Sequence, residues 1–289
     1  MRMAAKKSKV PELPIKYWSH SSLLAFLRNP LAWHKRYVEL VYDTPSGPAA
    51  VVGRAAHTAL QHYYGGISKE GALQLGLEYL RDVADFEINF GKAKTKTDKK
   101  KKREQMEREY TQAVQFYLEK PPRYKVLGVE VKATVSVEGL PLPIKAVSDL
   151  VVASKVDPKG IDIVDHKFVS AFTPYGADKS LFVLQAIFNY YTVKKTYGKP
   201  VRRFIVHECK ISRNADGSPQ MRRHIIDFRP FRSEFIIFNR LVRDATVALA
   251  HTKVFLPNPS DMFEGENSFD IYRINLAPEE YDAHFRPDE

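Results

Sequence analysis

The segment Ile161–Phe168, which reads IDIVDHKF, places an acid and an amine inside a stretch that otherwise has the pattern of a buried strand. Because side chains alternate across a strand, Asp165 and Lys167 share one face with Ile161 and Ile163. A charged group at the end of an apolar face is costly unless it is paired or binds a metal ion. The pattern therefore predicts either a structural ion pair or a reaction site.

A second carboxylate, Asp149, interrupts the apolar pattern of the preceding predicted strand, Ile144–Ala153. If these two strands pair in antiparallel fashion, Asp149 and Asp165 come close together. Neighbouring carboxylates raise the pKa of one of them unless a cation lies between them, and a hard divalent cation prefers oxygen ligands. Mg²⁺ or Mn²⁺ at this position would polarise a phosphate and activate a bound water, while Lys167 orients that water or stabilises the developing charge. This chemistry is phosphodiester hydrolysis, with a cross-strand ion pair as the alternative.

The elements that must hold these residues follow from hydrophobic period and turn residues. The pattern predicts a helical N-terminal part over residues 1–122, an α/β core over 123–251 and a tail over 252–289, all within a single domain. The helices expected in the first part cover 21–38 with a break at Pro30, then 51–64, 71–90 and 104–118; in the core we expect strands at 126–137, 144–153, 161–168, 203–210 and 222–228 and helices at 181–195 and 231–251. This order predicts an α/β fold with a central mixed β-sheet flanked by helices.

The charge of the chain points to a polyanionic partner. With 45 Lys and Arg against 34 Asp and Glu, the 289 residues carry a formal net charge of +11, which favours nucleic acid as partner over a merely solvated basic surface. Basic residues concentrate between Lys92 and Arg108. We expect 92–103 to form a mobile basic loop that either follows phosphates or is simply solvated; its DNA-binding candidates are Lys99, Lys100, Lys101, Lys102 and Arg103.

Several classes of protein are disfavoured. The one cysteine, Cys209, cannot form an internal disulfide or a four-cysteine cluster and fits a reducing compartment. No apolar run approaches the roughly 20 residues of a membrane span, and no secretory signal is recognisable. No phosphate-binding GxxxxGK[ST] loop is present, so we expect no nucleotide cofactor. These features predict a cytoplasmic protein, in the host cytoplasm if phage-encoded, whose DNA is unwound by a partner helicase or held by a single-strand-binding or recombination protein.

Five motifs in order carry a family resemblance. They are Gly53-x-x-x-His57, Glu130, Asp149, Asp165-x-Lys167 and a helix bearing Gln185 followed by Tyr190. Over residues 21–191 this order resembles the PD-(D/E)XK nuclease superfamily and, within it, the RecB-like, Cas4-like exonuclease branch. The resemblance implies a restriction-endonuclease-like core.

The resemblance also implies a role for each residue. Asp149, Asp165, Lys167 and Gln185 would be catalytic, and His57, Asp149, Asp165 and the carbonyl of His166 would bind the metal. Gln185 and Tyr190 would contact DNA. Glu130 would be an additional site acid, or would face solvent if the alternation of its strand continues unbroken.

Two departures from the family pattern bear on these roles. The tyrosine usually found four residues after the glutamine is replaced by Asn189, and Asn29-Pro30 stands where some relatives have the Cys-Pro of an iron–sulfur cluster. The resemblance thus implies an Mg²⁺- or Mn²⁺-dependent deoxyribonuclease without such a cluster, an exonuclease acting on DNA ends or single strands in recombination, repair or replication. A structure-specific endonuclease and a non-catalytic DNA-binding subunit remain open.

Overall fold

The computed structural model describes residues 13–41, 45–174, 178–215 and 220–257. Its contacts divide the chain into two compact units, a larger one formed by 43–138 with 144–238 and a smaller one formed by the remaining residues. The helical part expected over 1–122 is therefore shared between them, because its first two helices belong to the smaller unit and the others to the larger. Of the expected tail, 258–289 lie outside the described residues.

The smaller unit packs around two tryptophans. It contains the short strand β1 (Trp18–Ser19), α1 (His20–Arg28), α2 (Pro30–Tyr37) and the part of α7 (Arg232–His251) that follows residue 238. Trp18 and Trp33 are fully buried, and their indole N–H groups donate to Thr246 Oγ1 and Ser22 Oγ, respectively, each at 2.9 Å. These hydrogen bonds satisfy the polar edges of the buried rings.

The larger unit is built on a mixed sheet. Its strands are β2 (Val126–Val135), β3 (Ile144–Ala153), β4 (Ile161–Val169), β5 (Val201–Lys210) and β6 (Met221–Asp227). Neighbours along the chain are neighbours in the sheet; β4 and β5 are parallel and the other pairs antiparallel. The parallel pair needs a crossover, which α6 (Asp178–Tyr197) provides. The predicted α/β fold with a mixed sheet flanked by helices is confirmed.

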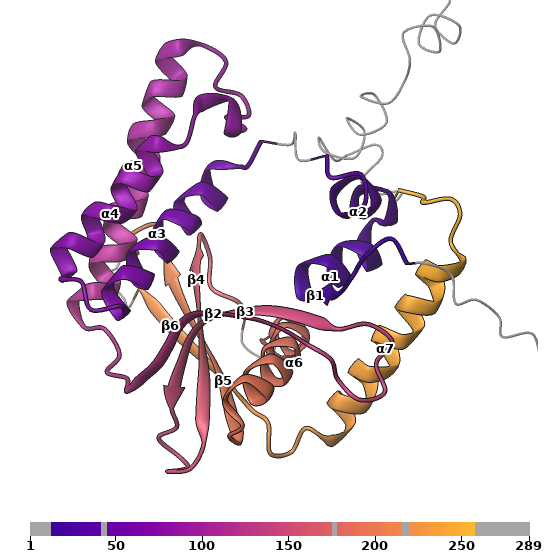
Figure 1. Ribbon diagram of the computed structural model, residues 1–289. Coiled ribbons are helices and arrows are strands. Elements are labelled where there is room, and N and C mark those ends of the chain that lie inside the picture. The colour runs from indigo at the N-terminus through magenta and orange to yellow at the C-terminus, as the bar shows by residue number, and fades with distance from the viewer. Residues whose placement is uncertain (1–12, 42–44, 175–177, 216–219, 258–289) are drawn as a thin grey trace, which may run out of the picture. The chain divides into compact units, whose positions relative to one another are not determined.

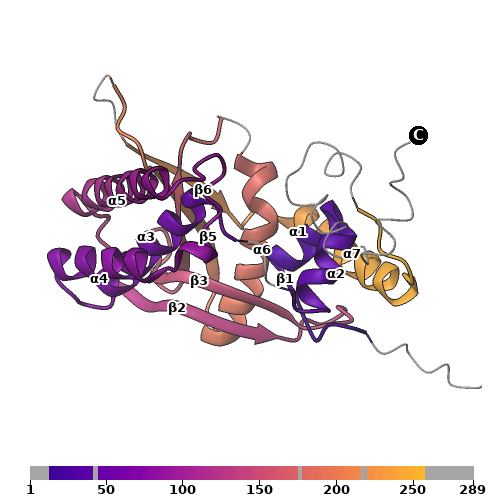
Figure 2. The same cartoon turned by 90° about the horizontal axis from the view of Figure 1, so that it is seen from above.

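Helices cover both faces of this sheet (Figures 1 and 2). On one face, α6 packs on the side chains of Ile163, Phe204 and Val206. On the other, α3 (Pro48–Tyr64), α4 (Lys69–Asp82) and α5 (Lys96–Glu119) form a helical layer that buries Cys209 and Ile211. The alternation along β4 therefore sends odd-numbered side chains toward α6 and even-numbered ones toward the helical layer.

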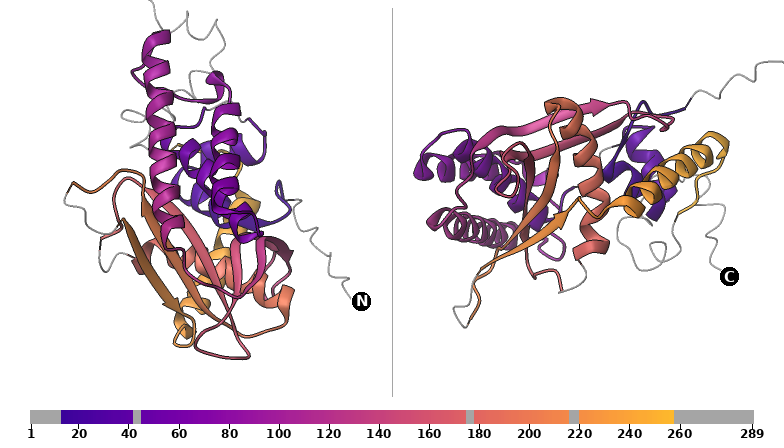
Figure 3. Two further views of the ribbon diagram at one scale, coloured as in Figure 1. Left: turned by 90° about the vertical axis from the view of Figure 1, so that its left-hand side faces the viewer. Right: turned by 90° about the horizontal axis from the view of Figure 1, so that it is seen from below.

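The predicted basic loop at 92–103 is wrong, because α5 begins at Lys96 and carries most of that segment as a helix that extends beyond the sheet (Figure 3). The cap explains the early start. The Thr95 hydroxyl accepts a hydrogen bond from the Asp98 amide at 3.1 Å and donates one to the Asp98 carboxylate at 2.7 Å. An N-cap with an acid in the first turn stabilises a helix start that the lysines alone would not.

Candidate active site

The two aspartates lie where the ladder between β3 and β4 ends. The paired residues run from Ala153↔Ile161 to Leu150↔Val164, and the next positions in the same register are Asp149 and Asp165. Beyond this point β3 continues with β2 and β4 with β5. Two strands that separate in this way leave room for side chains between them, so the register brings both carboxylates to the opening as the sequence predicted.

Asp165 is held from two sides. The amide of Gln185, on α6, donates to Asp165 Oδ1 at 2.7 Å, and Lys167 Nζ lies 2.9 Å from Asp165 Oδ2. The pKa of Asp165 is raised, first because the carboxyl is buried and then because Asp149 is near, although Lys167 opposes the shift. The crossover that places α6 over β4 thus unites the predicted acid, lysine and glutamine, which are contributed by two elements.

Nitrogen atoms of two histidines lie next to the Asp149 carboxylate. Its Oδ2 accepts the backbone N–H of His166 at 2.8 Å and lies 3.3 Å from Nδ1 of His57, which α3 supplies from the helical layer. Burial disfavours the charged carboxylate, but His57 and His166 outweigh it and hold the pKa of Asp149 well below its usual range. Conversely, burial opposes a charge on His57, yet Asp149 raises the pKa of this imidazole. This half-buried pair of opposite charges therefore links α3 to the sheet.

Glu130 lies level with Asp149, at an irregularity in β2. Its φ of 49° lies in the left-handed region, which is rare for a residue other than glycine, and it sits between the pairs Val129↔Leu150 and Val131↔Ser148, level with Asp149. The carboxyl is half-buried; burial and then Asp149 raise its pKa. Strained backbone of this kind concentrates at functional sites.

These side chains suit a divalent cation. One ligand atom from each of His57, Glu130 and Asp149 lies within 4.8 Å of the other two. Asp165 Oδ2 is buried, and Lys167 Nζ, 2.9 Å away, is its charged partner. Carboxylates gathered with one imidazole fit a hard or borderline metal such as Mg²⁺ or Mn²⁺.

One predicted DNA contact, Tyr190, lies elsewhere. The ring of Tyr190, on α6, packs against Phe228 and Phe235 at 4.9 and 4.7 Å between centroids and is partly buried against the core. Asn189, at the position where the family usually has tyrosine, is buried and accepts a hydrogen bond from Ser148 Oγ at 2.6 Å. The departure from the family pattern thus has a structural reason, since Asn189 connects α6 to β3.

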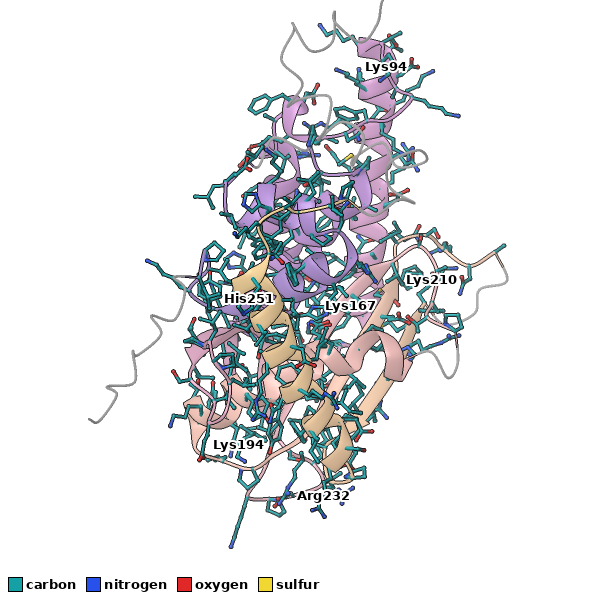
Figure 4. All side chains as sticks on the ribbon, turned by 90° about the vertical axis from the view of Figure 1, so that its right-hand side faces the viewer. Lys94, Lys167, Lys194, Lys210, Arg232 and His251 are labelled. Atoms are coloured by element: carbon teal, nitrogen blue, oxygen red, sulfur yellow. The ribbon has the colours of Figure 1, made fainter. Side chains whose placement is uncertain are left out.

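The predicted basic residues are also remote from the carboxylates. Lys99 to Lys102 lie in the first turns of α5, and Figure 4 shows neighbouring Lys94 at one end of the helical layer, away from Lys167. Arg103 is engaged within the protein, with Nε 2.9 Å from Asp85 Oδ1 and further donation to the carbonyls of Leu80 and Val83. Arg103 thus anchors the turn before α5, and its role in DNA binding stays a prediction.

A buried network behind the site was not anticipated. Nε2 of His166 lies 2.8 Å from the Tyr117 hydroxyl, which lies 2.6 Å from that of Tyr64. Next to it, the Tyr124 hydroxyl lies 2.6 Å from Nε2 of His207. Tyrosines at apolar helix positions look like ordinary core residues in a sequence, so only the partners across the fold identify this network.

This network makes stability depend on pH through His207. Its pKa is lowered to about 3, mainly by burial and also by His166 and Arg223. A histidine in the unfolded chain has a pKa near 6.5. Below that pH the unfolded chain therefore binds a proton, whereas the native His207 ring stays neutral. Stability is therefore lost as pH falls from about 6.5 to about 3. By pH 5 this loss amounts to about 2 kcal/mol.

The measurement is the free energy of unfolding at pH 8 and pH 5. We expect His207→Gln to lose less stability between these two values than the unaltered protein, by about 2 kcal/mol. The same exchange at exposed His251 serves as control, because it removes an imidazole without opening the core. Equal losses in the unaltered protein and His207→Gln would contradict a neutral buried ring.

Comparison with known proteins agrees with this geometry. A family model of the PD-(D/E)XK nuclease superfamily matches residues 17–252. No curated protein matches the chain. The crystal structure of SSO0001 aligns over 90% of this chain and 95% of that chain, with 12% identity and a TM-score of 0.33, a likeness too low to support an inference.

Among the described helices, none combines the length and the apolar character that a membrane span requires.

The family match spans most of the chain and includes every element that contributes to the carboxylate cluster, from α3 to α6. The chain therefore belongs to the PD-(D/E)XK nuclease superfamily.

Proposed function

We propose that this protein is an Mg²⁺- or Mn²⁺-dependent deoxyribonuclease whose reaction takes place at the opening between β3 and β4. The observation that carries the proposal is the joint placement of Asp149, Asp165 and Lys167 at the end of one ladder, with His57 beside them. Family membership supports hydrolysis of nucleic acid phosphodiesters. A pure binding module would gain nothing from clustering like charges at a buried position.

The roles follow from the contacts. The groups proposed to hold the metal are His57, Glu130, Asp149, Asp165 and the His166 carbonyl. When bound, the metal would polarise the phosphate and lower the pKa of an attacking water. Lys167 shares a face with Asp165 and holds a positive charge where negative charge develops on the phosphate. Gln185 donates to Asp165 Oδ1, which keeps that carboxylate from rotating away.

Within this activity we propose an exonuclease of the RecB-like type, acting on DNA ends or single strands in recombination, repair or replication. The ordered motifs from Gly53 to Gln185 support this branch. The chain has no nucleotide-binding loop of the kind that drives unwinding, so we propose that a helicase or a single-strand-binding or recombination protein supplies open DNA. The buried, reduced Cys209 fits a cytoplasmic setting.

The test is digestion of end-labelled linear DNA and covalently closed circular DNA with Mg²⁺ or Mn²⁺. We expect linear single strands and tailed duplexes to shorten from their ends, closed circles to stay intact, and EDTA to abolish all cleavage. Nicking or linearisation of the circles would show an endonuclease instead. Salt-sensitive binding without cleavage under any divalent metal would show a non-catalytic subunit and overturn the proposal.

A further inference from the structure

An exposed aromatic residue, Phe86, directly follows Asp85, which lines a strongly basic hollow in the helical layer. Phe86, in the short 3₁₀ turn Asp85–Glu87 between α4 and α5, is 81% exposed. The hollow, of about 410 Å³, is lined by Asp85 of this turn and by basic residues, namely Lys94, Lys96, Lys99, Lys100 and Arg103. A single exposed apolar residue is ordinary, but this one shares its turn with Asp85 of the basic hollow.

The charge of this hollow is unbalanced. Arg103 and Asp85 form an ion pair with the two groups 2.7 Å apart, so the two cancel. None of the four lysines forms a salt bridge with any residue between 13 and 257 that the structure describes. Four like charges around one hollow repel one another, and an anionic ligand relieves that repulsion.

The turn that carries Phe86 is rigidly anchored. Arg103 donates to Asp85 and to two carbonyls at the end of α4, and it lies over the ring of Phe90 at 5.9 Å. On the other side, the Ser46 amide donates to the Glu87 carbonyl at 2.9 Å and the Asn89 amide to the Ser46 carbonyl at 3.0 Å. The exposed ring is therefore presented by a fixed backbone, which lowers the entropy cost of binding to it.

We infer that Phe86 and Lys94, Lys96, Lys99 and Lys100 form a binding platform for single-stranded nucleic acid, on which a base stacks over the Phe86 ring while the lysines contact the adjoining phosphates. This Phe86 platform deepens the proposed function, on which it rests. Duplex bases are already stacked on one another, so a duplex gains only the lysine contacts, whereas an unpaired base gains both.

The platform's place in the fold suits a strand on its way to the carboxylates. Ser46, which pairs with Ile88 next to the turn, lies just before α3, and α3 carries His57 to Asp149. The two sites are thus joined through one helix while they remain separate, as Lys94 and Lys167 show in Figure 4. Such a platform keeps hold of the strand while its end reaches the site.

The test measures binding of a fluorescent single-stranded oligothymidylate and of a blunt-ended, fully paired duplex to the full chain in EDTA, where no cleavage occurs. We expect Phe86→Ala to weaken single-strand binding about tenfold and duplex binding less than twofold, with an unchanged salt dependence. Replacing Lys99 and Lys100 by Gln should weaken the binding of both ligands. It should also reduce the slope of log affinity against log salt concentration by about 1 to 2. The matched control is Ile67→Ala. Ile67 is also apolar and exposed, but it lies just before the N-terminal end of α4, whereas Phe86 follows the C-terminal end.

A second variant keeps the inference testable if Phe86→Ala disturbs the turn. Both native tryptophans are fully buried, so Phe86→Trp adds the one exposed indole of the described residues, and its emission should be quenched by oligothymidylate but not by the fully paired duplex. Unquenched emission, or equal losses for both ligands in Phe86→Ala, would overturn the platform even if the protein cleaves DNA. Stacking at Phe86 in a protein that never cleaves would leave the platform standing and refute the nuclease.

Discussion

Lys167→Ala and Asp165→Asn are each expected to reduce metal-dependent DNA cleavage by about a hundredfold to a thousandfold, the usual cost of removing one charged group from a reaction centre. Each substitution removes one partner of the ion pair whose atoms lie 2.9 Å apart at the end of β4. The measurement is the initial rate of release of end label at saturating Mg²⁺ or Mn²⁺. The affinity for uncleaved DNA in EDTA should change little in comparison.

The control is Lys159→Ala, which makes the same change in an exposed turn before the start of β4. It loses one positive charge from the protein but none from the site, so we expect a rate within about twofold of the unaltered protein. If Lys167→Ala cleaves as fast as Lys159→Ala, the ion pair is structural and the assignment of the reaction centre is wrong.

Gly76→Ala is expected to destabilise the larger unit by about 3 kcal/mol, at the upper end of the cost of overpacking a core. An added Cβ would lie 2.2 Å from the Tyr110 hydroxyl oxygen and 2.6 Å from the carbonyl oxygen of Ala55. The Tyr110 hydroxyl donates to the Leu73 carbonyl at 2.6 Å and cannot retreat without breaking that bond. The measurement is the free energy of unfolding from denaturant titration.

Gly53→Ala is the matched control, because Gly53 also lies in a helix interior but an added Cβ meets no atom within 4 Å. There the change should leave stability unchanged or raise it by up to about 1 kcal/mol through helix propensity. A Gly76→Ala protein as stable as Gly53→Ala would show that α3, α4 and α5 do not approach as closely as described.

The strands around the site could be predicted from sequence because their side chains alternate under strong constraints. The predicted limits of Ile144–Ala153 agree with β3, and β4 extends one residue beyond the predicted Ile161–Phe168. With one turn between them, the antiparallel register follows, and with it the approach of Asp149 to Asp165. Local pattern was sufficient here because both faces of these strands are covered.

The helical layer was harder to predict because its helices depend on partners distant in sequence. α4 ends at Asp82, well before the predicted end at residue 90, and the next residues form the 3₁₀ turn that Arg103 anchors from α5. A run of lysines has no apolar period, so the helical state of 96–103 depends on the Thr95 cap and on tertiary contacts. Propensity alone is too weak to settle such a segment.

The sequence by itself predicted the kind of chemistry: its residue types on their expected strands named the acids and the lysine, and the family resemblance added the glutamine. Only the tertiary structure decided which of them meet. The separation of β3 from β4, the left-handed backbone at Glu130 and the crossover that brings Gln185 to Asp165 all arise from contacts between segments far apart in the chain. Short-range patterns encode periodicity and burial, whereas distances between distant segments are set by the packing of the whole core.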